Sequence, residues 1–318
     1  MVRRRLGNTG IEVSEIAFGG VEIGVPYGIG VKDRSDMLSH DEAIYLLHAA
    51  LDGGINFFDT ARLYGDSEML MGKALKDRRN KAVIATKCKH LKQAGEPLPS
   101  YSQLKQIIES SVEESLAALQ TDYLDVFMLH QADKDIIHND EIRAIFETLR
   151  QRGLIRATGL STYTVEETKL AIDSKAWNVI QIPFNLMDQR QAALFPLAVS
   201  QGVGLVVRSV LLKGLLSSRG RDLHPALHQV EAHIQKYKAL LDSSTQHIST
   251  VATKFALSFD EVSSVLVGID RMTYLKESLK NADGKYLNAE ELQRAKNLAY
   301  PNPEFIDLHR WHQEGWLL

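Results

Sequence analysis

The sequence is poor in cysteine and shows no excess of charge of either sign. Cys88 is the one cysteine among 318 residues, so no disulfide can form within the chain, which fits a reducing compartment. With 37 basic and 40 acidic residues, the formal net charge is −3. This balance provides no basic surface for nucleic acid or for an anionic membrane, and neither is expected as a partner.

Long apolar runs and linkers are missing as well. No stretch approaches the roughly 18 uninterrupted apolar residues of a membrane-spanning helix. The basic start, Met1–Gly7, lacks the apolar run of a signal peptide, so we expect a cytoplasmic protein. No low-complexity tract or Pro/Ser/Gly-rich boundary interrupts the chain, and we expect one domain over residues 1–318.

The sequence has instead a regular alternation of short apolar runs and longer segments of helical period. Strand–helix units in this order predict a parallel sheet that closes into an α/β TIM barrel, (β/α)8. The strand candidates are Ile16–Gly19, Ile55–Asp59, Ala82–Lys87, Leu124–His130, Ile155–Ser161, Val179–Pro183, Val203–Arg208 and Ser264–Val267. The helix candidates are Asp41–Asp52, Ser67–Leu75, Ser102–Leu119, Glu141–Gln151, Val165–Ile172, Ala192–Ser200, Ile248–Leu257 and Thr273–Asn281.

Three segments lie outside this alternation. Arg3–Val13 holds the turn residues Gly7-Asn8-Thr9-Gly10 and predicts a hairpin across the barrel floor. Leu215–Ser244 is an insertion after the seventh strand, and Asn288–Leu318 predicts a final helix with an aromatic-rich tail.

Polar residues at the carboxyl ends of barrel strands are the candidates for catalysis, because active sites of such barrels lie there. Asp59 ends the second predicted strand, and Tyr64 follows it closely. Lys87 ends the third strand and His130 the fourth. A carboxylate, a phenol, an amine and an imidazole are therefore expected to meet at one rim.

This set suits proton transfer to a carbonyl oxygen. A free phenol has a pKa of about 10, and a neighbouring ammonium lowers it. We expect Lys87 to do this for Tyr64, and Asp59 to keep Lys87 charged and in place. A neutral His130 would orient the substrate oxygen by a hydrogen bond.

Taken alone, each of these residues has an ordinary structural explanation. Asp59 could cap a helix or form a turn, and Tyr64 could pack at the rim. Lys87 could be a solvated strand end, and His130 a hydrogen-bonded core histidine. Their combination on adjacent strands favours the catalytic interpretation.

Several motifs, in matching order and spacing, resemble the aldo-keto reductases from about Arg4 to Leu279. The resemblance implies hydride transfer between NAD or NADP and a carbonyl or alcohol carbon. It also implies that Asp59, Tyr64, Lys87 and His130 form the catalytic tetrad, with Tyr64 as general acid/base. The matching segments are Leu6–Ser14, Phe18-Gly19-Gly20, Gly54–Ala61, Tyr64-Gly65, Ser67-Glu68, Ala85-Thr86-Lys87 and Leu129-His130.

The resemblance also implies a nicotinamide site on the later strands. Ser161 and Thr162 stand where the family's Ser-Asn pair holds the nicotinamide amide, with Thr162 in place of Asn, and Gln181 matches a glutamine that contacts the same amide. Arg208–Leu216 resembles the loop that crosses the pyrophosphate, and many relatives carry a stacking Tyr where Arg208 stands. The loop residues implied in cofactor binding are Arg208, Ser209, Leu211, Lys213 and Gly214.

The segment 268–278 matches the family's adenosine-binding segment. Strongly NADP-dependent members carry a basic residue where Gly268 stands, an Arg where Tyr274 stands and an Asn where Ser278 stands. A 2′-phosphate needs charge-assisted partners, and Arg271 is the main cation here, with Lys276 the other nearby. We therefore expect NAD to be favoured over NADP. The implied contact residues are Gly268, Arg271, Tyr274, Glu277 and Ser278.

Two other patterns receive ordinary interpretations. His224, His228 and His233 have a spacing that could suggest a metal, but His224 precedes a proline in a charged region, and we expect no metal site. Cys88 adjoins Lys87 in a strand, where neighbours face opposite ways, so it is expected to pack outward against helices.

The expected substrate is a small carbonyl compound or a sugar. The long loop Val21–His40 is similar to that of the branch that includes sugar dehydrogenases. Two other functions stay open: a cofactor-binding regulatory subunit of the same fold, and a Schiff-base aldolase that uses Lys87. The oligomeric state is not indicated.

Overall fold

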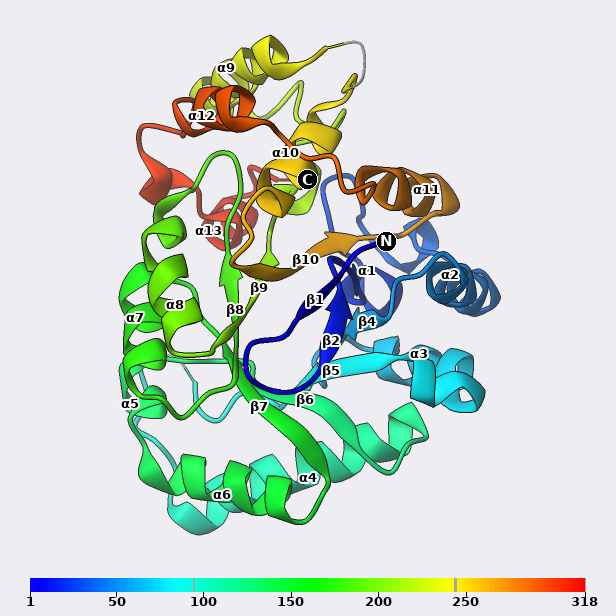
Figure 1. Cartoon of the computed structure of the whole chain (residues 1–318), viewed down its shortest axis with the longest axis vertical. Coiled ribbons are helices and arrows are strands. Elements are labelled where there is room, and N and C mark those ends of the chain that lie inside the picture. The colour runs from blue at the N-terminus through cyan, green and yellow to red at the C-terminus, as the bar shows by residue number, and fades with distance from the viewer. Residues whose placement is uncertain (94, 243–244, 318) are drawn as a thin grey trace.

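A computed structural model describes residues 1–93, 95–242 and 245–317. Within this part of the chain, eight parallel strands close into a barrel in chain order, with the last paired to the first. Figure 1 shows the strands in the middle of the molecule and the helices around them. The barrel strands are β3 (Ile16–Gly19), β4 (Phe57–Asp59), β5 (Val83–Lys87), β6 (Leu124–Leu129), β7 (Ile155–Ser161), β8 (Val179–Pro183), β9 (Gly204–Arg208) and β10 (Val262–Gly268).

A helix follows each barrel strand, so the predicted (β/α)8 TIM barrel is confirmed. These helices are α2 (His40–Asp52), α3 (Ser67–Leu75), α4 (Tyr101–Leu119), α6 (Asp140–Gln151), α7 (Val165–Asp173), α8 (Phe195–Ser200), α10 (Ile248–Leu257) and α11 (Met272–Asn281). Further helices are α1 (Val21–Gly24), α5 (Lys134–Ile137), α9 (His228–Lys236), α12 (Ala289–Lys296) and α13 (Leu308–Gln313). None of the helices described here is long and apolar enough to cross a membrane.

One predicted helix boundary is wrong. The helix expected from Ala192 to Ser200 is a tight 3₁₀ turn over Arg190–Leu194, and α8 begins only at Phe195. Pro196 explains this, because it lacks an amide hydrogen and its ring would clash with the preceding turn of a continuous helix. Proline is tolerated in the first turn of a helix, which is where it stands in α8.

The apolar side chains form two layers. The larger layer lies between the strands and the surrounding helices, and Cys88 is buried in it as expected. The smaller layer fills the barrel interior. Its members are Leu6, Ile11, Val13, Ala17, Phe57, Val83, Ala85, Val126, Met128, Ala157, Val179, Val206 and Leu266.

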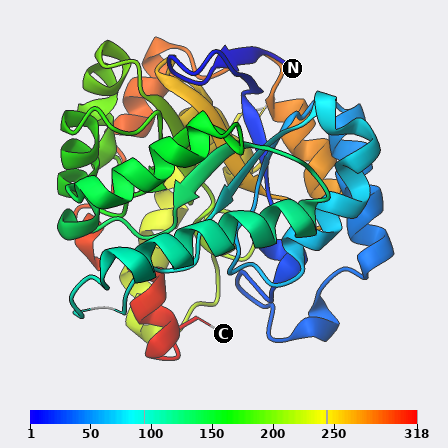
Figure 2. The same cartoon turned by 90° about the horizontal axis from the view of Figure 1, so that it is seen from below.

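The predicted hairpin is confirmed and closes one end of the barrel. β1 (Arg3–Arg5) pairs with β2 (Glu12–Ser14) in antiparallel fashion. Gly7 has a φ of +55°, and a Cβ there would collide with the backbone at Gly202, so only glycine fits this approach. Figure 2 shows the hairpin at one end of the barrel and the C-terminal helix at the other.

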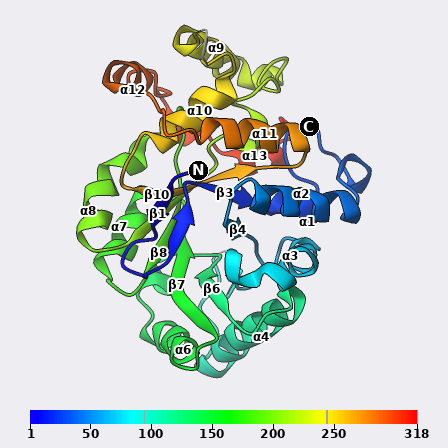
Figure 3. The ribbon, with the colours of Figure 1, turned by 45° about the vertical axis from the view of Figure 1, so that its right-hand side comes forward.

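The insertion and the C-terminal segment pack against each other. In Figure 3, α9 and α12 lie side by side away from the barrel. The Leu298 carbonyl accepts hydrogen bonds from Tyr237, at 3.1 Å, and from the His233 imidazole, at 2.9 Å. Trp316 stacks on His224 with 6.2 Å between ring centres. Residues 243, 244 and 318 of the two predicted segments lie outside the described residues.

The aromatic cluster behind β8 yields a stability prediction. Phe184 is fully buried, and its ring centre lies 5.1–5.4 Å from those of Phe195, Phe255 and Phe259. Phe184→Ala is expected to lower the free energy of unfolding by about 3–5 kcal/mol, because it leaves a cavity. Chemical denaturation measures this, with Val199→Ala, at an exposed position, as the control. A loss below about 1 kcal/mol would contradict the described packing.

Candidate active site

The carboxyl ends of the barrel strands surround a cavity of about 1030 Å³. Asp59, Tyr64 and His130 line it, and Lys87 lies beneath it, fully buried. The structure therefore brings together the residues that the sequence predicted to meet at one rim.

A buried ion pair forms the floor of this group. The Nζ of Lys87 donates to both carboxylate oxygens of Asp59 at 2.7 Å and to the Thr60 carbonyl at 3.0 Å. Gln181 adds a hydrogen bond to Asp59 at 2.8 Å. Burial lowers the pKa of Lys87, whereas the charge of Asp59 acts in the opposite direction. Each charge is thus satisfied within the barrel.

Tyr64 and His130 lie above the pair. The Nζ of Lys87 is 5.0 Å from the centre of the Tyr64 ring. The Tyr64 and His130 rings meet edge to face at 5.5 Å, with an angle of 84°. The phenol and the imidazole therefore face the same small volume of the cavity.

We expected Lys87 to lower the pKa of Tyr64, and in this arrangement that expectation is wrong. Burial raises the pKa of Tyr64 well above its usual value, and the charge of Asp59 raises it further. The charge of Lys87 is already balanced by Asp59 at 2.7 Å. Tyr64 is consequently a neutral phenol, able to donate a proton.

The expectation of a neutral His130 agrees with its surroundings. Burial lowers the pKa of His130 to about 2, and the charges of Lys87, His90 and Arg208 act in the same direction. Its Nδ1 is buried without a hydrogen-bond partner among the described residues. A neutral imidazole retains one N–H donor for a ligand oxygen.

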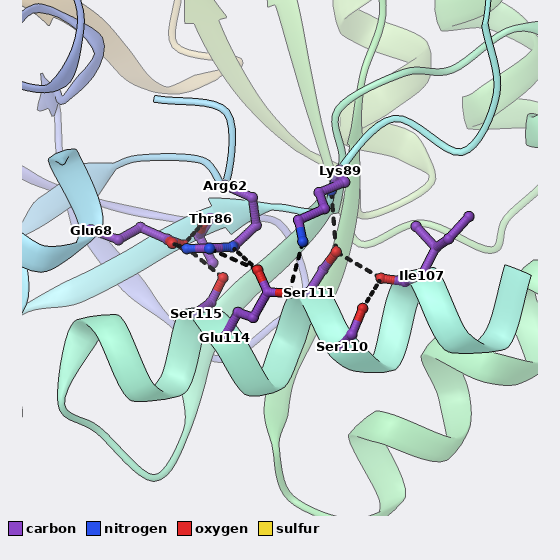
Figure 4. A network of polar contacts seen from close by, with 9 residues as sticks. All are labelled: Arg62, Glu68, Thr86, Lys89, Ile107, Ser110, Ser111, Glu114 and Ser115. Atoms are coloured by element: carbon purple, nitrogen blue, oxygen red, sulfur yellow. Dashed lines mark hydrogen bonds and ion pairs between the residues drawn. The ribbon is translucent and has the colours of Figure 1, made fainter. Parts of the chain in front are cut away.

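A polar network joins Arg62 and Glu68 to Thr86 of β5 and to helix α4 (Figure 4). Tyr64 stands between Arg62 and Glu68, which form an ion pair with each other. The buried Glu68 also accepts a hydrogen bond from Thr86 at 2.6 Å, and Thr86 precedes Lys87. Helix α4 is joined to this network by two of its residues. The Ser115 hydroxyl donates a hydrogen bond to Glu68 at 2.6 Å. Glu114 forms ion pairs with Arg62 at 2.8 Å and with Lys89 at 2.7 Å. The network thereby fixes the distance between the phenol and the ammonium.

The residues predicted at the nicotinamide end are only partly brought to the cavity. Ser161, Gln181 and Arg208 line it. Thr162 does not, because its hydroxyl is buried 2.7 Å from that of Thr168 in α7. Gln181 directs its amide nitrogen to Asp59, as described above.

Arg208 is held by its neighbours. Its guanidinium donates to the Thr162 carbonyl at 2.8 Å and to the Ser161 hydroxyl at 3.3 Å. It also lies 4.5 Å from the centre of the Tyr163 ring. The planar guanidinium of Arg208 is therefore held in one orientation where it lines the cavity.

The loop after β9 follows the cavity wall. Ser209, Leu211, Lys213 and Gly214, the loop residues implied in cofactor binding, all line the cavity. Ser209 and Lys213 have φ values of 60° and 57°, a left-handed conformation that costs energy in residues other than glycine. Lys213 also lies 4.9 Å from the centre of the Tyr27 ring, and burial lowers its pKa. The loop thus presents a cation at the cavity.

At the adenosine end, Gly268, Tyr274, Glu277 and Ser278 line the same cavity. Arg271 does not: it borders a smaller neighbouring cavity of about 280 Å³. There its guanidinium forms an ion pair with Asp270 at 3.3 Å and lies 5.0 Å from the Tyr274 ring centre.

The sequence reasoning missed several lining residues. Glu22 comes from the short helix α1 after β3, Tyr27 from the loop that follows this helix, and Arg219 from the insertion. Loop residues outside a motif carry no periodic signal that could have indicated them. The C-terminal segment also forms part of the wall, through Pro303, Glu304, Ile306, Asp307, Leu308 and His309.

Over residues 1–93, 95–242 and 245–317, no group of three His, Cys, Asp or Glu residues is arranged to hold a metal ion.

Comparison with known proteins places this geometry in a family. The sequence model described as "Aldo/keto reductase family" matches residues 15–299. The chain belongs to that family. Members named as oxidoreductases are similar over most of its length, which makes this chain an oxidoreductase by family.

Three relatives illustrate the similarity. The L-galactose dehydrogenase of Arabidopsis thaliana is 29% identical, over 94% of this chain and 97% of the relative. The uncharacterized oxidoreductase YqkF of Bacillus subtilis is 27% identical, over 92% and 95%. The structure of aldo-keto reductase AKR11C1 from Bacillus halodurans, in its holo form, superposes with a TM-score of 0.78 at 29% identity, covering 94% of this chain and 96% of that one.

The neutral state of His130 predicts a pH dependence of stability. Its pKa is about 2 in the folded chain against an ordinary 6.5, so below pH 6.5 the unfolded chain binds a proton that the folded chain does not. Stability should therefore fall as the pH decreases from 7 to 5, by up to about 1.4 kcal/mol per pH unit for this one group. His130→Gln should flatten the profile measured by urea denaturation, whereas His312→Gln, at an exposed position, serves as the control. Equal slopes in wild type and His130→Gln would show that His130 is protonated in the fold.

Proposed function

We propose that this member of the aldo/keto reductase family transfers a hydride between NAD(H) and the carbonyl or alcohol carbon of a small substrate, with Tyr64 as the proton donor and acceptor. The observation that carries the proposal is the placement of Tyr64. A neutral phenol faces a neutral imidazole at the cavity, above a buried ammonium–carboxylate pair.

The cavity suits a dinucleotide. Its volume of about 1030 Å³ is at the upper end of the usual range for ligand sites, and it extends from Tyr64 to Ser278. Ser161, Gln181 and Arg208 would hold the nicotinamide end. The loop with Lys213, together with Arg219, would face the pyrophosphate, and Tyr274, Glu277 and Ser278 would hold the adenosine. When bound, the reduced nicotinamide supplies the hydride.

Two side chains would bind the substrate oxygen during reduction. Tyr64 donates its phenolic hydrogen, and His130 donates its single imidazole N–H. As negative charge develops on the substrate oxygen, the proton passes from Tyr64 to it. Among the neighbouring charges, that of Arg208 lowers the pKa of Tyr64 and would stabilise the phenolate. In the oxidative direction, the phenolate accepts the proton from an alcohol.

The aldolase alternative is not favoured by the state of Lys87. A Schiff base requires a neutral amine with a free lone pair. Lys87 is fully buried, and its Nζ donates hydrogen bonds to three oxygens, at 2.7, 2.7 and 3.0 Å. The alternative of a regulatory subunit does not explain why Asp59, Tyr64, Lys87 and His130 are assembled at the cavity.

We infer that the substrate is a small polar carbonyl compound or a sugar. Asn185, Asp188 and Arg190 follow β8 and line the cavity together with Asp307 and His309 of the C-terminal segment. Such donors and acceptors suit a molecule with several hydroxyl groups. The similarity to an L-galactose dehydrogenase supports the same substrate class.

The catalytic role of Tyr64 is tested by Tyr64→Phe. Removing the transferable proton should lower kcat by about 10²–10⁴-fold with an aldehyde or sugar substrate. The dissociation constant of NADH should barely change, because the ring remains. Tyr45→Phe, on the exposed face of α2, is the matched control. Near-normal turnover of Tyr64→Phe would mean that another group supplies the proton.

The cofactor preference is tested by fluorescence titration. Gly268 and Tyr274 provide no cation, and Arg271 is engaged by Asp270 outside the main cavity. We therefore expect NADH to bind at least as tightly as NADPH, since the 2′-phosphate lacks the charged hydrogen bonds worth about 1.5–3 kcal/mol each. Arg271→Ala should leave the ratio of the two dissociation constants within about threefold, as should the surface control Arg152→Ala. NADPH binding more than about tenfold tighter in wild type, lost in Arg271→Ala, would identify Arg271 as a phosphate ligand.

A further inference from the structure

Glu22 occupies the junction between the catalytic and adenosine parts of the cavity. It follows the end of β3, and its side chain lies over Gly268 at the end of the paired strand β10. A Cβ at position 268 would collide with its Oε1. The carboxyl group therefore fills the space that a larger residue at 268 would take.

This carboxyl group is poorly satisfied by the protein. Its Oε2 is buried and has no hydrogen-bond partner among the described residues. The pKa of Glu22 is raised to about 8, mainly by burial, and the charges of Asp270 and Asp59 act in the same direction. Polar atoms buried in this way are nearly always paired. An unpaired carboxyl oxygen in the wall of a ligand cavity therefore points to a ligand that donates hydrogen bonds.

The surroundings of Glu22 favour hydroxyl groups and disfavour phosphate. Asp270 adds a second carboxylate beside it, and this carboxylate holds two guanidinium groups, Arg271 at 3.3 Å and Arg219 at 4.0 Å. Arg219 also donates to the Ile29 carbonyl at 2.9 Å. Hydrogen bonds from a diol offset the cost of ionising the buried carboxyl group, whereas a phosphate adds like-charge repulsion. In other nucleotide sites, an acidic side chain binds the ribose hydroxyls of NAD and thereby distinguishes it from NADP.

We propose that Glu22, seated over Gly268, accepts the ribose hydroxyls of NAD(H) and is the side chain that discriminates against NADP(H). The proposal rests on the function proposed above, and it assigns selectivity to one carboxylate in addition to the missing cations. Gly268 and Glu22 act as a pair, because glycine provides the room in which the carboxylate lies.

The test uses dissociation constants of NADH and NADPH, measured by fluorescence with the full chain. Glu22→Gln keeps the shape of the side chain and removes its ability to ionise. NADH should bind about five- to twentyfold more weakly, because the carboxyl group that ionises against the ribose hydroxyls is replaced by a neutral amide. NADPH should bind as well as before or better, so the selectivity ratio should fall about tenfold or more. Glu166→Gln, an exposed carboxylate on α7, is the matched control and should leave both constants unchanged.

A second variant, Gly268→Ala, displaces the Glu22 carboxyl group without changing Glu22 itself. In Gly268→Ala, the new methyl group must push the Glu22 carboxyl from its position. Like Glu22→Gln, this variant should bind NADH more weakly than wild type, with little change in NADPH binding. This variant decides the question if Glu22→Gln fails to fold, as judged by circular dichroism.

Three results would overturn the proposal. The first is a selectivity ratio within twofold of wild type in folded Glu22→Gln and Gly268→Ala. The second is a change in KM for the carbonyl substrate with no change in nucleotide binding, which would assign Glu22 to the substrate. In both cases the proposed function stands. The third is wild-type chain that binds neither nucleotide, which would overturn the proposed function as well.

Discussion

The active rim depends on the buried ion pair between Lys87 and Asp59. Charges taken out of water are costly unless closely paired, and here the pair has two contacts of 2.7 Å with further hydrogen bonds from Gln181 and to Thr60. The pair connects β4, β5 and β8 across the barrel. Its two charges also act on different neighbours: Asp59 raises the pKa of Tyr64, and Lys87 lowers that of His130. Burial keeps both groups neutral, and the two charges of the pair act in the same direction.

The rest of the structure keeps this arrangement fixed. The hairpin and the inner apolar layer fill the opposite end of the barrel, so the strands cannot shift along one another without creating voids. Arg62, Glu68 and Thr86 join the turn that carries Tyr64 to the strand that carries Lys87. The cavity itself is completed by segments outside the repeating units, which come from the insertion and from the C-terminal end.

Much of this could be predicted from the sequence, for identifiable reasons. Strands buried on both faces are nearly continuous apolar runs, so Val179–Pro183 was found to the residue. Tyr64 and Lys87 stood out because polar residues at strand ends break that pattern. The pKa of Tyr64 was predicted with the wrong sign, because burial depends on parts of the chain far away in sequence. Glu22 was missed for a similar reason: its significance arises only beside Gly268, which lies 246 positions later in the chain.

The division of the cavity wall has a consequence for how such a protein can diversify. Lys87 belongs to barrel strand β5, and Tyr64 and His130 follow strands β4 and β6, whereas residues of the segment Pro303–His309 form the outer wall. That outer segment is anchored by Trp311, which is fully buried, and by Trp316 stacked on His224. Its lining side chains can therefore be exchanged by mutation while its anchors and the reaction chemistry stay intact. Evolution can alter which molecules enter this barrel without altering what is done to them.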